Sequence, residues 1–137
     1  MINLNCEYPD LRSYFNSKDK KWLKKCASQR ARLGLAYCDT WNFDSFLLGI
    51  IIRGLRQLAD NSHGYPGFVP FDTFEKWQIY LLDLADKFEL ARRYIYDEDD
   101  YWETHTQQES TARHEQGMKL LKEAFVELAE NLPAMWD

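Results

Sequence analysis

Residues 74–95 contain the feature that most constrains the fold of this chain, an apolar stripe that repeats over three heptads. The intervals between its members alternate between three and four residues. The stripe consists of Phe74, Trp77, Leu81, Leu84, Phe88, Ala91 and Ile95. Because an α-helix completes a turn in about 3.6 residues, this spacing lines one face of a helix. Asp72 or Thr73 is expected to cap the helix, and Glu75 suits the positive end of its dipole.

Two further segments show the same helical spacing. Residues 40–61 place apolar side chains at Phe43, Phe46, Leu47, Ile50, Ile51, Leu55 and Leu58. Leu48 and Ile52 add a neighbouring apolar face, so this helix is expected to be the most buried one, capped by Thr40 or Asn42 and ended by Asn61. The second segment, residues 111–137, carries Met118, Leu121, Phe125, Leu128 and Leu132. Pro133 is expected to end that helix, so that Met135 and Trp136 fold back onto the bundle.

A weaker helix is expected at residues 17–35, with Ser17 as its cap and Gly34 as its stop. Its apolar stripe is thin, and lysines and arginines cover its outer face. No segment has the two-residue period of a β-strand. The sequence therefore predicts an all-α protein, a compact helical bundle of three long helices plus a basic N-terminal helix. We expect residues 1–137 to form a single helical domain.

The connection at residues 61–68, "NSHGYPGF", is interpreted as a turn. Gly64 and Gly67 permit positive φ angles, and Pro66 extends the residue before it. Tyr65 and Phe68 are expected to pack beneath the loop, and His63 is most simply a hydrogen-bonding residue of the loop.

Composition places the chain among soluble intracellular proteins. Its aromatic fraction of 15% argues against disorder. Cys6, Cys26 and Cys38 form an odd set without a CxxC pair, which is typical of a reduced compartment. The N-terminus lacks a signal-peptide pattern, and the longest apolar run, Phe46–Ile52, is too short to cross a bilayer. A cytoplasmic location is expected.

Charge is distributed unevenly around a net value of −5. Residues 1–36 are basic, whereas residues 37–137 are acidic. Such asymmetry indicates either a charged partner or two parts of the chain that attract each other. Possible phosphate-contacting residues in the basic segment are Lys18, Lys20, Lys21, Lys24, Lys25, Arg30 and Arg32. Because the whole chain is acidic, with a pI of about 5.2, a solvated or intramolecular role for this segment is preferred over nucleic-acid binding.

The residues of common catalytic and metal sites are not arranged in any recognisable motif. The three histidines are far apart, and no Glu-x-x-His occurs. The run Asp97–Asp100 lacks the glycine and the final glutamate of a calcium loop. Neither a GxSxG elbow nor a glycine-rich phosphate loop is found, and Cys38 has no histidine close to it in sequence. The sequence predicts neither an enzyme nor a protein with a cofactor or metal.

An acidic connection with interleaved aromatic residues precedes the last helix. Its predicted partner-binding residues are Asp97, Glu98, Asp99, Asp100, Tyr101, Trp102 and Glu103. Such a surface would suit a basic groove on another protein, because aromatic anchors within charged surroundings are common at interfaces. The alternative interpretation is that these aromatic residues attach the loop to its own core.

From about residue 40 to residue 137, the sequence resembles a family of small proteins encoded by bacteriophages and prophages. The resemblance lies in "TWNFDSFLLGIIIRGLRQL", "HGYPG", "FDTFEKWQIYLLDLADKFEL" and "GMKLLKEAFVELAENLPAMWD". It implies a helical fold and a viral origin, and it carries no activity and no functional residues. Small acidic phage proteins often bind and disable a host protein. The resemblance therefore favours a non-enzymatic inhibitor of a host protein, and an anti-CRISPR-like inhibitor acting by occlusion is one such protein. The alternative is a structural, assembly or replication accessory protein that forms homo-oligomers.

Overall fold

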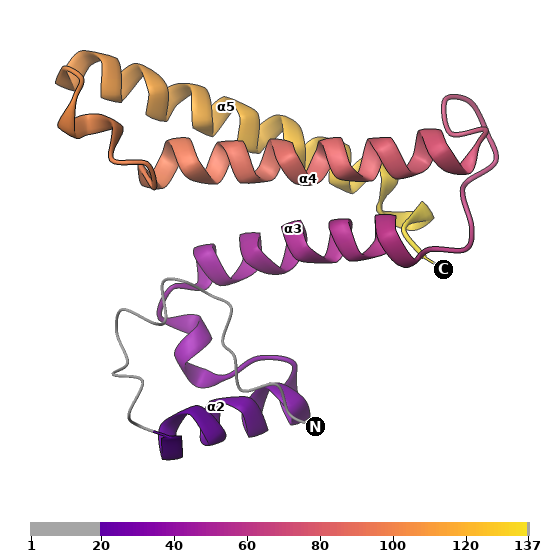
Figure 1. The fold of residues 1–137 in the computed structure, drawn as a ribbon, viewed down its shortest axis with the longest axis horizontal. Coiled ribbons are helices and arrows are strands. Elements are labelled where there is room, and N and C mark those ends of the chain that lie inside the picture. Colours follow the sequence, from indigo (N-terminus) through magenta and orange to yellow (C-terminus); the bar gives the residue numbers. More distant parts are fainter. Residues whose placement is uncertain (1–19, 137) are drawn as a thin grey trace. The chain divides into compact units, whose positions relative to one another are not determined.

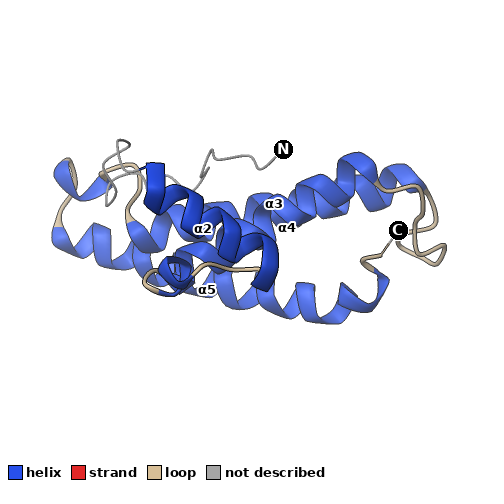
Figure 2. Cartoon of the chain, turned by 90° about the horizontal axis from the view of Figure 1, so that it is seen from below, coloured by secondary structure: helices blue, strands red, loops and turns tan. Residues whose placement is uncertain are grey.

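The computed structural model describes residues 20–136, and it confirms the predicted all-α class (Figure 1, Figure 2). The α-helices of this part of the chain are α2 (Lys20–Leu33), α3 (Phe43–Asn61), α4 (Phe74–Tyr96) and α5 (Gln107–Asn131). The short 3₁₀ turns are η1 (Tyr37–Thr40), η2 (Tyr101–Glu103) and η3 (Leu132–Ala134). Between residues 20 and 136 there is no β-strand, only an isolated bridge between Phe68 and Phe71. None of the described helices is long and apolar enough to span a bilayer.

Internal contacts divide the chain into two compact units, and the boundary between them in the sequence lies between Gly49 and Ile50. Unit 1 contains α2, η1 and the first part of α3, and unit 2 contains the remainder of α3 with α4 and α5. The charge boundary after residue 36 lies inside unit 1. Contacts and charge therefore divide the chain at different positions.

Helix α2 ends where the sequence predicts. Gly34 adopts a φ of 82° and donates its backbone N–H to the carbonyl of Arg30 at 3.0 Å. A glycine in this left-handed conformation is the usual way to stop a helix, because it has no Cβ to clash. The predicted cap, Ser17, lies outside the described residues.

Helix α4 is the centre of unit 2, and its apolar stripe is the best-predicted feature of the fold. The hydroxyl of Thr73, rather than Asp72, accepts the N-terminal hydrogen bond from the backbone of Lys76, at 3.3 Å. The buried side chains are Trp77, Leu81, Leu84, Ala85, Phe88 and Ala91. The expectation that the helix of residues 40–61 is the most buried is wrong, because α4 contains more fully buried side chains than α3 does.

Helix α3 ends at Asn61, as predicted, but its buried face is rotated relative to the predicted stripe. Phe43 and Ile50 are exposed. The buried side chains are Phe46, Leu48, Ile52, Leu55 and Ala59. Within unit 2, the Gln78 side chain donates a hydrogen bond to the Ala59 carbonyl at 2.8 Å.

Helix α5 lies along α4 and runs in the opposite direction (Figure 1). The predicted stripe of α5 is only partly buried: Leu121 and Leu128 are half-buried, Met118 and Phe125 are each 37% exposed, and the fully buried positions are Gly117 and Ala124. A Cβ atom at Gly117 would lie 2.9 Å from the Cβ of Tyr94. The two helices therefore approach each other through small residues, and the edge-to-face rings of Phe125 and Phe88, with centroids 5.1 Å apart, add to the contact.

The N-terminus of α5 also differs from the prediction. The helix begins at Gln107, because Thr106 and Glu109 form a reciprocal capping box. The Glu109 backbone donates to the Thr106 hydroxyl at 3.2 Å, and the Thr106 backbone donates to the Glu109 carboxylate at 2.8 Å. The Thr-x-x-Glu spacing at residues 106–109 is the sequence signal for this start.

The connection between α3 and α4 is a turn, as predicted, but Tyr65 and Phe68 are exposed rather than packed beneath it. Gly67 adopts a φ of 79° and donates its N–H to the carbonyl of Phe71 at 3.1 Å. Phe71 is the buried ring, with its centroid 4.9 Å from that of Trp77. Its position immediately before α4 brings it onto the apolar face of that helix.

Candidate partner-binding site

The acidic connection between α4 and α5 is shaped by Asp97. Helix α4 stops there because Asp97 adopts a left-handed conformation, with a φ of 51°. The two oxygens of its carboxylate then accept hydrogen bonds from the backbone N–H groups of Tyr101 and Trp102, at 3.1 and 3.3 Å. Aspartate tolerates this backbone conformation better than most residues. Asp97 thus fixes the start of η2.

Arg113 of α5 holds the connection from the other side. One of its terminal nitrogens, Nη2, donates to both carboxylate oxygens of Asp99, at 2.8 and 2.6 Å. Its guanidinium carbon lies 4.3 Å from the ring centroid of Tyr94 and 4.3 Å from that of Tyr101. Hydrogen bonding to Arg113 lowers the pKa of Asp99 below its ordinary value. This arrangement joins α4, the connection and α5, and no pattern in the sequence singles out either Arg113 or Tyr94.

Two more contacts order the same turn. The rings of Tyr101 and His105 are stacked, with centroids 3.4 Å apart. Glu98 forms an ion pair with Arg92, with 2.9 Å between Oε1 and Nε. Four of the seven predicted partner-binding residues are therefore engaged within unit 2: Asp97, Glu98, Asp99 and Tyr101.

The other three predicted residues face solvent, and we call them the acidic tip: Asp100, Trp102 and Glu103. Trp102 is 62% exposed. The tip therefore presents a largely exposed indole, with two exposed carboxylates close to it in sequence, on a turn whose backbone is held by internal contacts. Both interpretations of the sequence describe part of this loop, since Tyr101 attaches it to the core and Trp102 projects from it. Binding through these residues stays a prediction.

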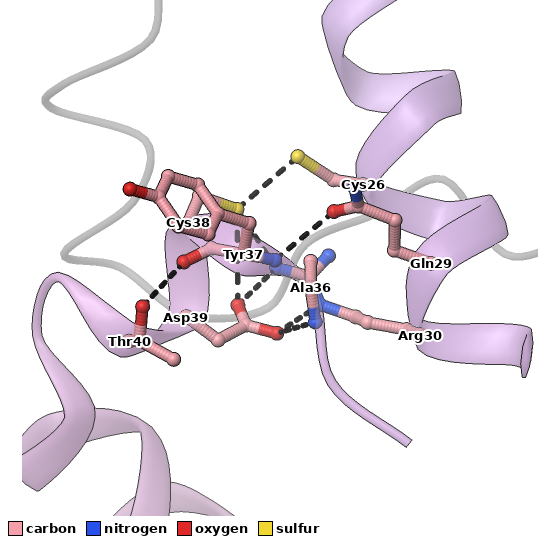
Figure 3. Close-up of polar contacts among 8 residues, drawn as sticks. All are labelled: Cys26, Gln29, Arg30, Ala36, Tyr37, Cys38, Asp39 and Thr40. Carbon is pink, nitrogen blue, oxygen red and sulfur yellow. Dashed lines mark hydrogen bonds and ion pairs between the residues drawn. The ribbon is translucent and has the colours of Figure 1, made fainter. Parts of the chain in front are cut away.

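Six of the seven predicted phosphate-contacting residues lie on α2, in unit 1. The seventh, Lys18, is outside the described residues. Lys20 begins α2, and Lys21, Lys24, Lys25 and Arg32 are exposed along it. Arg30 is engaged elsewhere, because its Nε and Nη2 atoms donate to the two carboxylate oxygens of Asp39 at 2.9 and 2.5 Å (Figure 3).

Asp39 is the centre of a buried polar cluster. Its side chain is fully buried, and it also accepts a hydrogen bond from the backbone N–H of Ala36 at 2.7 Å. The Arg30 guanidinium thus compensates a carboxylate that has no access to water. This pair fixes η1 against α2.

Two free thiols lie beside this ion pair. The Sγ atoms of Cys26 and Cys38 are 3.1 Å apart, and both side chains are buried (Figure 3). Burial, together with the hydrogen bond between the Cys26 and Cys38 side chains, raises the pKa of Cys38 to about 12. A thiol with this pKa is protonated at neutral pH and is a poor nucleophile.

Among residues 20–136, no three His, Cys, Asp or Glu side chains come close enough together to hold a metal ion. Comparison with known proteins adds no further assignment, since no family model, curated protein or solved structure matches the chain. The resemblance to phage-encoded proteins thus stays an expectation from the sequence.

Proposed function

We propose that this protein is a non-enzymatic binding protein whose acidic tip engages a positively charged surface on a partner protein. The observation that carries the proposal is the 62% exposure of Trp102, which lies close in sequence to the exposed Asp100 and Glu103 on an internally braced turn. Trp is prominent among the residues that dominate binding energy at interfaces. A large exposed indole on an ordered turn is suited to that role.

The bracing of the turn favours tight binding. A loop that must become ordered on association loses part of the interaction energy to that ordering. Here Asp97 holds the backbone of Trp102, and Arg113 holds Asp99. The tip is therefore preorganised for its partner.

The charge of unit 2 favours a basic partner. Residues 50–137 contain nine Lys or Arg against seventeen Asp or Glu. An excess of negative charge accelerates encounter with a positive surface and disfavours acidic partners. A groove that normally holds nucleic acid is one such surface.

The resemblance to phage-encoded proteins supports a bacterial host protein as the partner. Occupation of its basic groove would block the natural ligand, which is how an anti-defence, anti-CRISPR-like inhibitor acts by occlusion. Such an inhibitor would work in the cytoplasm of the host cell.

The test is capture from a nuclease-treated bacterial lysate with three versions of the full chain. The tip variant carries Asp100→Asn, Trp102→Ala and Glu103→Gln, which leave the bracing residues intact. A matched control removes the same residue types at exposed positions elsewhere in unit 2: Asp83→Asn, Glu123→Gln and Trp136→Ala. We expect the wild type and the control to retain one host protein in stoichiometric amount and the tip variant to lose it. Equal retention of the host protein by all three versions would show that the acidic tip does not bind it.

Exposed apolar side chains favour the alternative function, a phage structural or assembly protein that forms homo-oligomers. In unit 2 these side chains include Ile79, Met118, Phe125, Val126 and Leu132. Exposed apolar surface of this kind is a common basis of self-association. A defined multimer in sedimentation equilibrium, together with presence in purified virus particles, would support this alternative. A monomer that binds a host protein would support the inhibitor.

A further inference from the structure

Helix α2 has a basic stripe that is available to solvent. Lys21, Lys25 and Arg32 are all exposed. At about 100° per residue, the three positions lie within a sector of about 40° around the helix axis. Their cations are therefore arranged in a row along one side of α2. Residues 20–49 contain six Lys or Arg against two Asp, and Asp39 is already paired with Arg30.

Aromatic rings lie immediately beside this stripe. Trp22 stacks on Trp41, with ring centroids 6.0 Å apart, and Tyr37 contacts the edge of Trp41 at 5.9 Å. Trp41 is 52% exposed and Tyr37 is 67% exposed. The Nζ atom of Lys25 lies 5.9 Å from the Trp22 ring centroid, so Lys25 connects the basic stripe to the group of aromatic rings. We call Lys21, Lys25, Arg32, Tyr37 and Trp41 the basic–aromatic face.

Internal contacts of unit 1 fix the rings relative to α2. The side chain of Gln29 accepts a hydrogen bond from the backbone N–H of Tyr37 at 3.0 Å (Figure 3). The Arg30–Asp39 pair holds η1, which directly precedes Trp41. The exposure of the two rings is thus part of an ordered local structure.

We infer that the basic–aromatic face binds single-stranded nucleic acid. Cations in a row attract the phosphate backbone without regard to sequence, and exposed rings stack with bases that are not paired. A duplex offers the phosphates but keeps its bases stacked internally, and an anionic membrane or acidic protein offers no bases. The combination of a cationic row and adjoining rings therefore selects a single strand. The basic–aromatic face belongs to unit 1 and the acidic tip to unit 2, and this inference does not depend on the proposed function.

The test measures fluorescence anisotropy of a labelled oligothymidylate of about 20 nucleotides with the full chain, as salt increases from about 50 to about 200 mM. We expect the variant Lys21→Ser, Lys25→Ser, Arg32→Ser to bind weakly and to reduce the slope of log K against log salt by about 2. Trp41→Ala and Tyr37→Ala should each weaken binding roughly 5- to 150-fold without changing that slope. Trp41→Phe, which keeps a ring, should restore most of the affinity. Far-UV circular dichroism verifies that each variant is folded.

The matched control is Lys119→Ser with Lys122→Ser, which removes two exposed cations from α5 in unit 2. It should bind the oligothymidylate as the wild type does. An equal loss of affinity in this control would overturn the inference, as would unchanged binding by the two aromatic variants. Absence of binding at low salt, or binding to duplex DNA or anionic vesicles as tight as to the single strand, would overturn it too.

Discussion

Arg113 and Asp99 form the contact that joins the acidic connection to helix α5, with 2.6 Å between Nη2 and the nearer carboxylate oxygen. The Arg113 side chain is only 11% exposed, because Tyr94 and Tyr101 cover its guanidinium. Hydrogen bonding to Asp99 raises the pKa of Arg113, so its charge is permanent. The position of Trp102 thus depends on a residue of another element.

Replacement of Arg113 by Ala should loosen the turn while leaving the helices folded. The Asp99 carboxylate loses its cation, and Tyr101 loses the planar group that lies on its ring. We expect faster hydrogen exchange at the backbone amides of Tyr101 and Trp102, measured by mass spectrometry or NMR. Capture of the partner should weaken as well, although Trp102 itself is unchanged. Lys119→Ala, on the same helix, is the control, and equal exchange in both variants would show that Arg113 does not brace the turn.

Gly117 is expected to be intolerant of any side chain. In Gly117→Ala the new methyl would lie 2.9 Å from the Cβ of Tyr94 and 3.2 Å from the carbonyl oxygen of Ala91, so α4 and α5 must separate. Overpacking of this kind lowers the free energy of unfolding by about 1–3 kcal/mol. Urea denaturation followed by circular dichroism measures the change.

Gly54 provides a matched control for that experiment. It also lies inside a helix, but a Cβ there would meet no atom within 4 Å. Gly54→Ala should therefore raise the free energy of unfolding by about 0.5–1 kcal/mol, since Ala is the better helix former. If Gly117→Ala and Gly54→Ala changed the free energy of unfolding in the same direction, the close approach of α4 and α5 would be contradicted.

Asp39 is the residue of unit 1 whose loss should be most destabilising. Asp39→Ala leaves the partly buried Arg30 without its carboxylate and the N–H of Ala36 without its acceptor. Removal of one partner of such a pair should lower the free energy of unfolding by about 3 kcal/mol. Denaturation monitored by tryptophan fluorescence would measure this loss.

The exposed pair of Lys76 with Asp72 serves as the comparison. Lys76→Ala removes an ion pair of the same charge type and should leave stability almost unchanged, because surface pairs contribute little. If Asp39→Ala were equally mild, the buried pair would have no structural role.

Because of Cys38, the stability of unit 1 is expected to vary with pH in the alkaline range. Its pKa is raised from 9.0 to about 12 in the folded protein, so the folded state retains a proton that the unfolded state releases. Stability from this group is therefore complete below about pH 9 and is lost as the pH rises toward 12. Thermal denaturation of the wild type and of Cys38→Ala is compared between about pH 8 and about pH 10.5, values that lie around the ordinary pKa. The melting temperature of the wild type should fall more steeply than that of Cys38→Ala as the pH rises. Parallel curves would contradict the assignment.

The sequence predicts α4 well and α5 less well, for a physical reason. Large apolar residues such as Trp77 and Phe88 mark a buried face directly, so periodicity identifies it. In α5 the fully buried positions are Gly117 and Ala124, which a search for large apolar residues passes over. Close packing through small residues is visible only when the opposing helix is known.

Prediction from the sequence is limited in a similar way for the acidic connection, where the candidate site lies. Its composition is local, so the sequence could identify the whole segment as a candidate. Which of its side chains turn inward depends on Arg113, fourteen residues beyond Asp99 in the chain. In the same way, the pairing of Arg30 with Asp39 requires the turn made by Gly34 and η1. Contacts across such distances leave no pattern in a single sequence.

The measurement that tests the central claim most directly is photo-crosslinking from position 102 inside bacterial cells. A photoreactive phenylalanine analogue replaces Trp102 in one version of the full chain and Trp136, another exposed indole of unit 2, in the other. We predict a single covalent adduct with a host protein from position 102 and none from position 136, with the adduct lost when Asp100→Asn and Glu103→Gln are added. Adducts of equal yield from both positions, or adducts only with a second copy of this chain, would contradict the claim that the acidic tip is the partner-binding surface.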